Sequence, residues 1–126
     1  LKKFIPFCFL FIGTLALPYP SLAEEKIEVI PLIQTSKGLS GKNFNYQEGK
    51  PELRLLKVKI PAGIKTPIHT HPAPMLIHVT RGRLKHVRGE EINFFKAGDA
   101  FVESNNGGAH YVKMLERSRL YFMWGL

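Results

Sequence analysis

Apolar and polar residues alternate from Leu53 to the end of the chain, and turn-forming residues interrupt the alternation every eight to twelve positions. A period of two places every second side chain on one face of an extended strand. In the segment 53–60, for example, Val58 and Ile60 share one face while Lys57 lies on the other. No segment carries a sustained apolar stripe at helical spacing. The alternation therefore predicts an all-β domain, either a barrel or a sandwich.

Turn residues divide this domain into predicted strands. The predicted strands cover 26–33 and 53–60, two in 75–87 that meet at Gly82, two in 90–104 that meet at 96–99, and one each in 109–115 and 119–126. A glycine-rich loop is expected between the first two strands, and Pro31 interrupts the first of them. Because no repeat or linker divides the chain further, we expect one domain that covers residues 24–126.

The first 23 residues differ from this domain in composition. Two lysines precede an apolar run at 4–17, which is followed by two prolines and by Ser-Leu-Ala at 21–23. This order is typical of a secretory signal peptide, 1–23. As a helix the run reaches only about 21 Å, against about 30 Å for a bilayer core, so we expect no stable membrane anchor. The mature protein is therefore predicted to be periplasmic or secreted.

The mature part contains no cysteine, because the only one in the chain is Cys8. A hydrophobic core, with help from a metal ion or a partner subunit, must therefore stabilise it. Its basic residues exceed its acidic ones by six, which we interpret as a lysine-rich solvated face. Phosphate-binding glycine loops and dinucleotide fingerprints are absent from the sequence, and we expect no nucleic-acid partner. The aromatic C-terminal strand would suit a homodimer.

Two histidines, His69 and His71, stand two positions apart in the sequence HTHPAPM. On an extended strand both imidazoles leave the same face and can reach one ion. His110 begins a later alternating segment, in which it shares a face with Val112 and Met114. If that face lines a barrel, three imidazoles meet inside and form an open mononuclear metal site. Since a histidine on an apolar face is more often a packed core residue, the pattern alone leaves both interpretations open.

At these residues the chain resembles the cupin superfamily. The first cupin motif sets a glycine, His-x-His, a glutamate and a second glycine at defined intervals. Met75 stands where the glutamate would be, and the other matching residues are Gly63, His69, His71 and Gly82. The second motif matches at Gly98 and His110, but lacks its proline and has one extra residue before the histidine. The resemblance covers 53–126 and implies a single cupin-type barrel, also called a double-stranded β-helix or jelly roll.

The resemblance also implies a ligand set. Cupins usually bind a divalent metal through these histidines and the glutamate, so it implies that His69, His71 and His110 hold one ion, which could be Cu, Fe, Mn, Ni or Zn. Met75 departs from the pattern, and loss of the carboxylate weakens the preference for Fe(II) or Mn(II). A thioether is soft and favours copper, which makes Met75 a candidate metal ligand. Its alternative role is packing, because methionine fills irregular gaps in cores.

Glu103 is the carboxylate nearest His110 within the second motif. A buried carboxylate needs a partner or a function, so if Glu103 faces the cavity it is the candidate catalytic residue, a general base or a hydrogen-bond partner of a metal-bound water. His86 shares parity with Leu84 and could reach the interior. We favour instead a partly buried His86 bonded to backbone, and we expect His78 on the outer face.

Three functions are compatible with these residues. The leading hypothesis, implied by the resemblance, is a metal-dependent oxidoreductase of the dioxygenase type that acts on a small molecule. The alternative is a non-catalytic cupin that binds a metal or a small ligand, with copper as the ion if Met75 coordinates it. In the third, the histidines are relics of the motif in a structural protein. A fold does not decide among these functions.

Overall fold

Seven β-strands make up the computed structural model, which describes residues 13, 15, 18 and 26–125 and contains no helix among them. The strands are β1 (Leu53–Ile60), β2 (Met75–Arg81), β3 (Arg83–Arg88), β4 (Glu91–Lys96), β5 (Ala100–Glu103), β6 (Tyr111–Met114) and β7 (Ser118–Gly125). Gly82 separates β2 from β3, and Gly98 lies between β4 and β5, as the turn residues predicted. The all-β prediction is confirmed.

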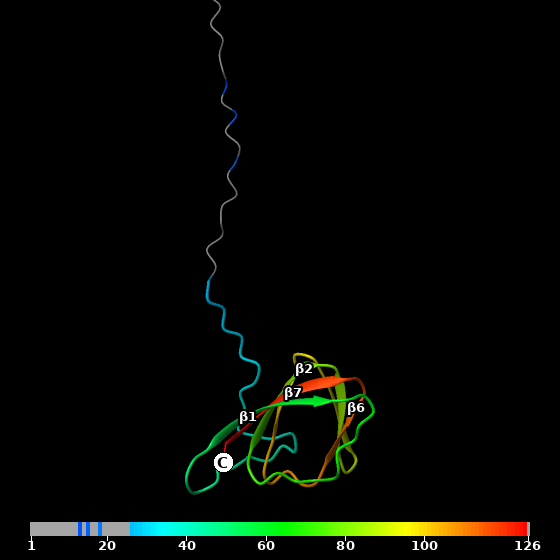
Figure 1. Cartoon of the computed structure of the whole chain (residues 1–126). Coiled ribbons are helices and arrows are strands. Elements are labelled where there is room, and N and C mark those ends of the chain that lie inside the picture. Colours follow the sequence, from blue (N-terminus) through cyan, green and yellow to red (C-terminus); the bar gives the residue numbers. More distant parts are fainter. Residues whose placement is uncertain (1–12, 14, 16–17, 19–25, 126) are drawn as a thin grey trace, which may run out of the picture.

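The strands form two antiparallel sheets that enclose one interior (Figure 1). One sheet has the strand order β1-β7-β2-β5, and the other has the order β4-β3-β6. Apolar residues from both sheets meet between them in a buried cluster made of Met75, Ile77, Val79, Leu84, Phe101, Met114 and Leu120. The core therefore lies inside the barrel, on the face that the alternation predicted to be apolar.

Residues 26–33 do not form a strand, which corrects the prediction made from their alternation. Ile27 and Val29 are 96% and 83% exposed, and this part of the chain extends away from the sheets (Figure 1). A strand persists only where a neighbouring strand pairs with its N–H and C=O groups, and Pro31 has no N–H to donate. A short alternation of apolar and polar residues is therefore insufficient to form a strand when no neighbouring strand pairs with it.

The predicted signal peptide, 1–23, lies outside the described residues apart from positions 13, 15 and 18, and it stays a prediction. Within the part of the chain that the structure describes, no helix is long and apolar enough to cross a membrane.

Candidate metal centre

His69 and His110 lie directly opposite each other on neighbouring extended segments. The segment that ends at His69 runs antiparallel to the one that leads into β6. The His69 N–H donates to the His110 carbonyl at 2.9 Å, and the His110 N–H donates back to the His69 carbonyl at 3.0 Å. Opposite residues of an antiparallel pair project their side chains to the same face. Both imidazoles consequently line the interior cavity.

His71 joins them from two positions further along the chain. His71 is only 8% exposed, His110 is 3% exposed, and His69 is half-buried. Pro72 and Pro74 follow directly, and the chain turns there before β2 begins. The parity of His69 and His71, which predicted a common face, thus holds although no regular strand contains them.

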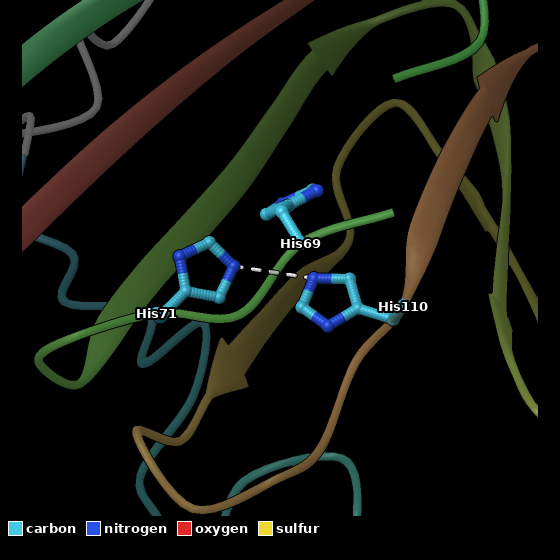
Figure 2. Close-up of side chains that lie close together, drawn as sticks. All are labelled: His69, His71 and His110. Carbon is cyan, nitrogen blue, oxygen red and sulfur yellow. Dashed lines mark hydrogen bonds between the residues drawn. The ribbon is translucent and has the colours of Figure 1, made fainter. Parts of the chain in front are cut away.

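The three rings lie close together, two of them on the segment that holds His69 and His71 and one on the segment that leads into β6 (Figure 2). The Nε2 atoms of His71 and His110 are 3.2 Å apart, and one ring nitrogen from each histidine lies within 4.8 Å of the other two. Two nitrogens bound to one ion at about 2.1 Å are roughly 3 to 4.2 Å apart. The predicted convergence is therefore observed, at nearly the dimensions that one ion requires.

Backbone carbonyls orient two of the rings. His69 donates its Nδ1–H to the Pro67 carbonyl at 2.7 Å, and His110 donates its Nδ1–H to the Gly108 carbonyl at 3.3 Å. A neutral imidazole that donates from Nδ1 keeps an unprotonated Nε2, which is the usual arrangement of metal-binding histidines. These Nε2 atoms are thus free to bind a cation. The donor set fits a divalent metal or copper.

Burial favours the neutral form of two imidazoles, those of His71 and His110. Burial, and next the charge of His110, lowers the pKa of His71 from 6.5 to about 4. Burial is also the main reason that the pKa of His110 is lowered. Because a metal binds neutral imidazole, protons do not compete with an ion at these two rings near neutral pH.

A buried carboxylate lies beside the histidines. Glu103 is 1% exposed; its Oε2 accepts a hydrogen bond from Arg88 Nη2 at 2.5 Å, and its Oε1 lies 3.8 Å from His110 Nε2. Burial by itself raises the pKa of Glu103, but contact with His86, followed by the charges of His110 and Arg88, lowers the pKa below its ordinary value. Glu103 therefore faces the cavity in its ionised form at neutral pH.

His86 and Arg88 complete this cluster; the sequence analysis considered His86 for the interior but favoured another role, and it missed Arg88. His86 is fully buried, stacks on His110 with ring centroids 4.8 Å apart, and contacts Glu103 Oε1 through Nε2. The interpretation of His86 as a partly buried residue bonded to backbone is therefore wrong, although its parity with Leu84 did indicate the interior. No pattern within one sheet could identify Arg88, because its contact with Glu103 joins β3 to a strand of the other sheet.

A cavity of about 340 Å³ adjoins the histidines. Apolar side chains from both sheets line most of it, including Ile77, Leu84, Phe101, Val112, Phe122 and Trp124. This volume is within the range of small-molecule sites. Met75 also lines the cavity and belongs to the core cluster, so its packing role is observed, while coordination by its sulfur stays a prediction. His78 is half-buried and has no place in the cavity lining.

No family model matches the chain, and no curated protein matches its sequence. Solved structures, however, have a similar fold. One is an RmlC-like cupin from Shewanella frigidimarina, with a TM-score of 0.53 and 20% identity over 59% of this chain and 66% of that chain. Another is KdgF from Halomonas sp., with a TM-score of 0.54 and 23% identity over 64% of this chain and 76% of that chain.

The chain is also similar to the DMSP lyase DddQ from Ruegeria pomeroyi, with a TM-score of 0.51 and 24% identity over 57% of this chain. The match spans 37% of that lyase and slightly less than two thirds of the RmlC-like cupin. Similarity at these identities establishes the fold, and it confirms the cupin-type barrel that the motifs predicted.

Proposed function

Since the chain has the cupin fold, we propose that it binds one metal ion through His69, His71 and His110 and uses the adjoining cavity to hold a small molecule. The observation that carries this proposal is the convergence of three imidazole nitrogens within 4.8 Å, two of them on rings that donate Nδ1–H to a backbone carbonyl. The ion belongs to the set Cu, Fe, Mn, Ni or Zn, all of which accept imidazole ligands.

The reaction class that we propose is oxidation of the dioxygenase type. In such a reaction both atoms of O₂ enter a small organic substrate, and no external reductant is consumed. A metal bound at the histidines would supply Lewis-acid or redox chemistry. The chain itself contributes the apolar cavity, which binds and orients the substrate and excludes water, and we propose that the mature protein does so after export.

A non-catalytic binding protein is the second candidate. Met75 stands where cupins usually have a glutamate, and its side chain lines the same cavity as the histidines. If its thioether binds the ion, three imidazoles and one sulfur form a copper site with every position filled. Such a protein would hold copper without turnover. Oxygen uptake with candidate substrates separates the two functions, because only the enzyme consumes O₂.

Metal analysis of protein expressed in defined medium tests the site. We expect about one ion per unmutated chain, and we expect His71→Ala to lose it, because a buried ligand is removed and two imidazoles remain. His78→Ala is the matched control, since it removes a half-buried histidine that lies outside the cavity lining. It should keep the ion.

The thermal midpoint gives an independent readout. An ion that binds only the folded state at a hundred times its Kd stabilises it by about 2.7 kcal/mol, so added metal should raise the midpoint of the unmutated protein and of His78→Ala, but not of His71→Ala. Metal content that is indifferent to His71, or a midpoint that no ion moves, would show that this is not a metal site.

A further inference from the structure

We propose that Glu103 is the anionic ligand of this metal centre, so that the carboxylate of the first cupin motif has moved from β2 to the neighbouring strand β5. This inference rests on the proposed function, because it concerns the same ion. It assigns Oε1 of Glu103 to the ion bound by the three histidines. His110 is the residue shared by the two groups of close donor atoms, one formed with His69 and His71 and the other with His86 and Glu103, so the assignment requires Glu103 to move closer to His71 when the ion binds. It also assigns Glu103 the role of a ligand in place of the general base considered above.

The strand register carries the first step. Met75 and Glu103 are direct partners in the antiparallel pair of β2 and β5. Side chains at directly opposite positions share one face and have Cβ atoms about 5 Å apart. Both residues line the interior cavity, on the side that holds the histidines. A carboxylate lost at 75 is therefore present one strand away, on the same face of the same sheet.

Distances to His110 carry the second step. Oε1 of Glu103 lies 3.8 Å from His110 Nε2, and this same nitrogen lies 3.2 Å from His71 Nε2. Both separations fall between the roughly 3 and 4.2 Å expected for two atoms bound to one ion at about 2.1 Å. Because Nδ1 of His110 is engaged with the Gly108 carbonyl, His110 has one nitrogen to give, and it faces the imidazole and the carboxylate together.

The partners of the two carboxylate oxygens carry the third step. Oε2 accepts the hydrogen bond from Arg88, whereas Oε1 contacts His86 Nε2 and faces His110 Nε2. The contacts with Arg88 and His86 hold the carboxylate so that Oε1 points toward His110. Each oxygen of an ionised carboxylate has two lone pairs, so Oε1 can contact His86 and still bind a cation. A cation beside His110 would take the second lone pair of Oε1, while Arg88 and His86 act as positioning residues.

This ligand set determines the class of ion. Three imidazoles and one carboxylate oxygen suit Mn(II), Fe(II), Ni(II) or Zn(II), whereas the copper site with Met75 depends on a soft sulfur ligand. The two proposed ligand sets can be distinguished by the affinity for a hard ion. If Glu103 is the fourth ligand, this affinity depends on Glu103 and not on Met75. Mn(II) is the probe of choice, because it has little affinity for thioether sulfur.

Titration of the full chain with Mn(II), followed by the electron paramagnetic resonance of the free ion, measures this affinity. Loss of a group that only orients a ligand costs about 10- to 100-fold in affinity. We therefore expect Glu103→Gln, which loses a direct ligand but keeps an amide oxygen for Arg88, to weaken binding at least about a hundredfold. Met75→Leu should leave it within about threefold of the unmutated value, because leucine preserves the packing volume.

The double variant M75E/E103Q provides the sharper test. A carboxylate restored at position 75 should recover Mn(II) affinity to within about tenfold of the unmutated protein. A loss of that size is no larger than the loss expected when only the orientation of a ligand is disturbed. M75Q/E103Q is its matched control, because it adds a polar side chain of equal length without the charge, and it should bind as weakly as E103Q. If Glu103 only paired with Arg88 and His86, a carboxylate on β2 would not restore binding.

Infrared difference spectra of the unmutated protein keep the inference testable even if a variant fails to fold. Addition of Mn(II) should shift the antisymmetric carboxylate stretch of glutamates labelled with ¹³C, and H71A should abolish the shift. The inference is overturned if E103Q binds Mn(II) within a few-fold of the unmutated chain, or if that band does not move. Failure of the metal site itself looks different, because then the unmutated chain binds no ion that depends on His71.

Discussion

At residue 110, one imidazole connects the three histidines to the buried carboxylate. Its Nδ1–H donates to the Gly108 carbonyl, and its Nε2 faces both His71 and Glu103. Its ring also stacks on His86. A change at any of these side chains therefore alters how strongly His110 can bind an ion, since the groups behind a ligand set its tautomer and orientation.

Acid should destabilise the metal-free protein. The pKa of His71 is about 4 in the folded chain, against an ordinary value of 6.5, so the unfolded chain binds more protons between these pH values. The free energy of unfolding consequently falls as pH decreases from 6.5 toward 4. The lowered pKa values of His110 and, at the acid end, Glu103 act in the same direction.

Urea denaturation at a series of pH values, with a chelator present, measures this effect. We expect His71 to account for no more than about 2 kcal/mol of the loss, because partial solvation screens its charge. In His71→Ala the decline over the same pH range should be shallower. An equal slope in both proteins would contradict the assigned role of His71 burial.

Among the elements, the turn between β2 and β3 depends on a single glycine. Gly82 has φ +85° in the left-handed region, and a Cβ there would lie 2.5 Å from Ser118 Oγ and 2.6 Å from the Arg117 carbonyl oxygen. The close approach brings the turn against the start of β7, and Ser118 is itself buried. The left-handed backbone conformation of Gly82 and the lack of space beside Ser118 both exclude a side chain at this position.

Gly82→Ala should lower the free energy of unfolding by about 2 to 4 kcal/mol, of which about 1 comes from the left-handed conformation and the rest from the clash. Gly89→Ala is the control. Its φ is +57° but no atom lies within 4 Å of the added Cβ, so it should cost only about 1 kcal/mol. Urea denaturation of both variants gives the comparison; similar losses would mean that the turn can move away from Ser118.

On the scale of the whole molecule, the outer face of the four-stranded sheet is apolar toward one end and carries basic residues such as Lys57 and Lys59 toward the other. Its central row crosses all four strands, because Leu55 pairs with Met123, Met123 with Leu76, and Leu76 with Val102. Leu55 is 69% exposed and Met123 is 42% exposed. Exposed apolar surface of this kind is typical of a contact with another protein surface.

The homodimer stays a prediction, and we propose this face as its contact. We expect the unmutated protein to have the mass of two chains by light scattering, and we expect Leu55→Lys to reduce it to one, because a charge would have to be buried in the contact. Ile92→Lys is the control, since Ile92 is 49% exposed on β4 of the other sheet. A mass that does not respond to Leu55 would exclude this face as the dimer contact.

Alternation and spacing alone were enough to predict the strands from Leu53 onward, the turns at Gly82 and Gly98, and a common face for His69 and His71. These features are local, since a period of two and the φ preference of glycine depend on neighbouring residues. The same local reasoning was wrong for 26–33, where no strand lies alongside to pair with the segment.

Only the tertiary structure decided which side chains contact one another across the barrel. His110 reaches His71 over 39 positions, Glu103 faces Met75 through the register of β2 and β5, and Arg88 contacts Glu103 from the other sheet. The burial of His86 belongs here too. Sheet pairing and closure set these contacts, and neither leaves a periodic trace in the sequence, because each joins residues whose local patterns are independent of one another.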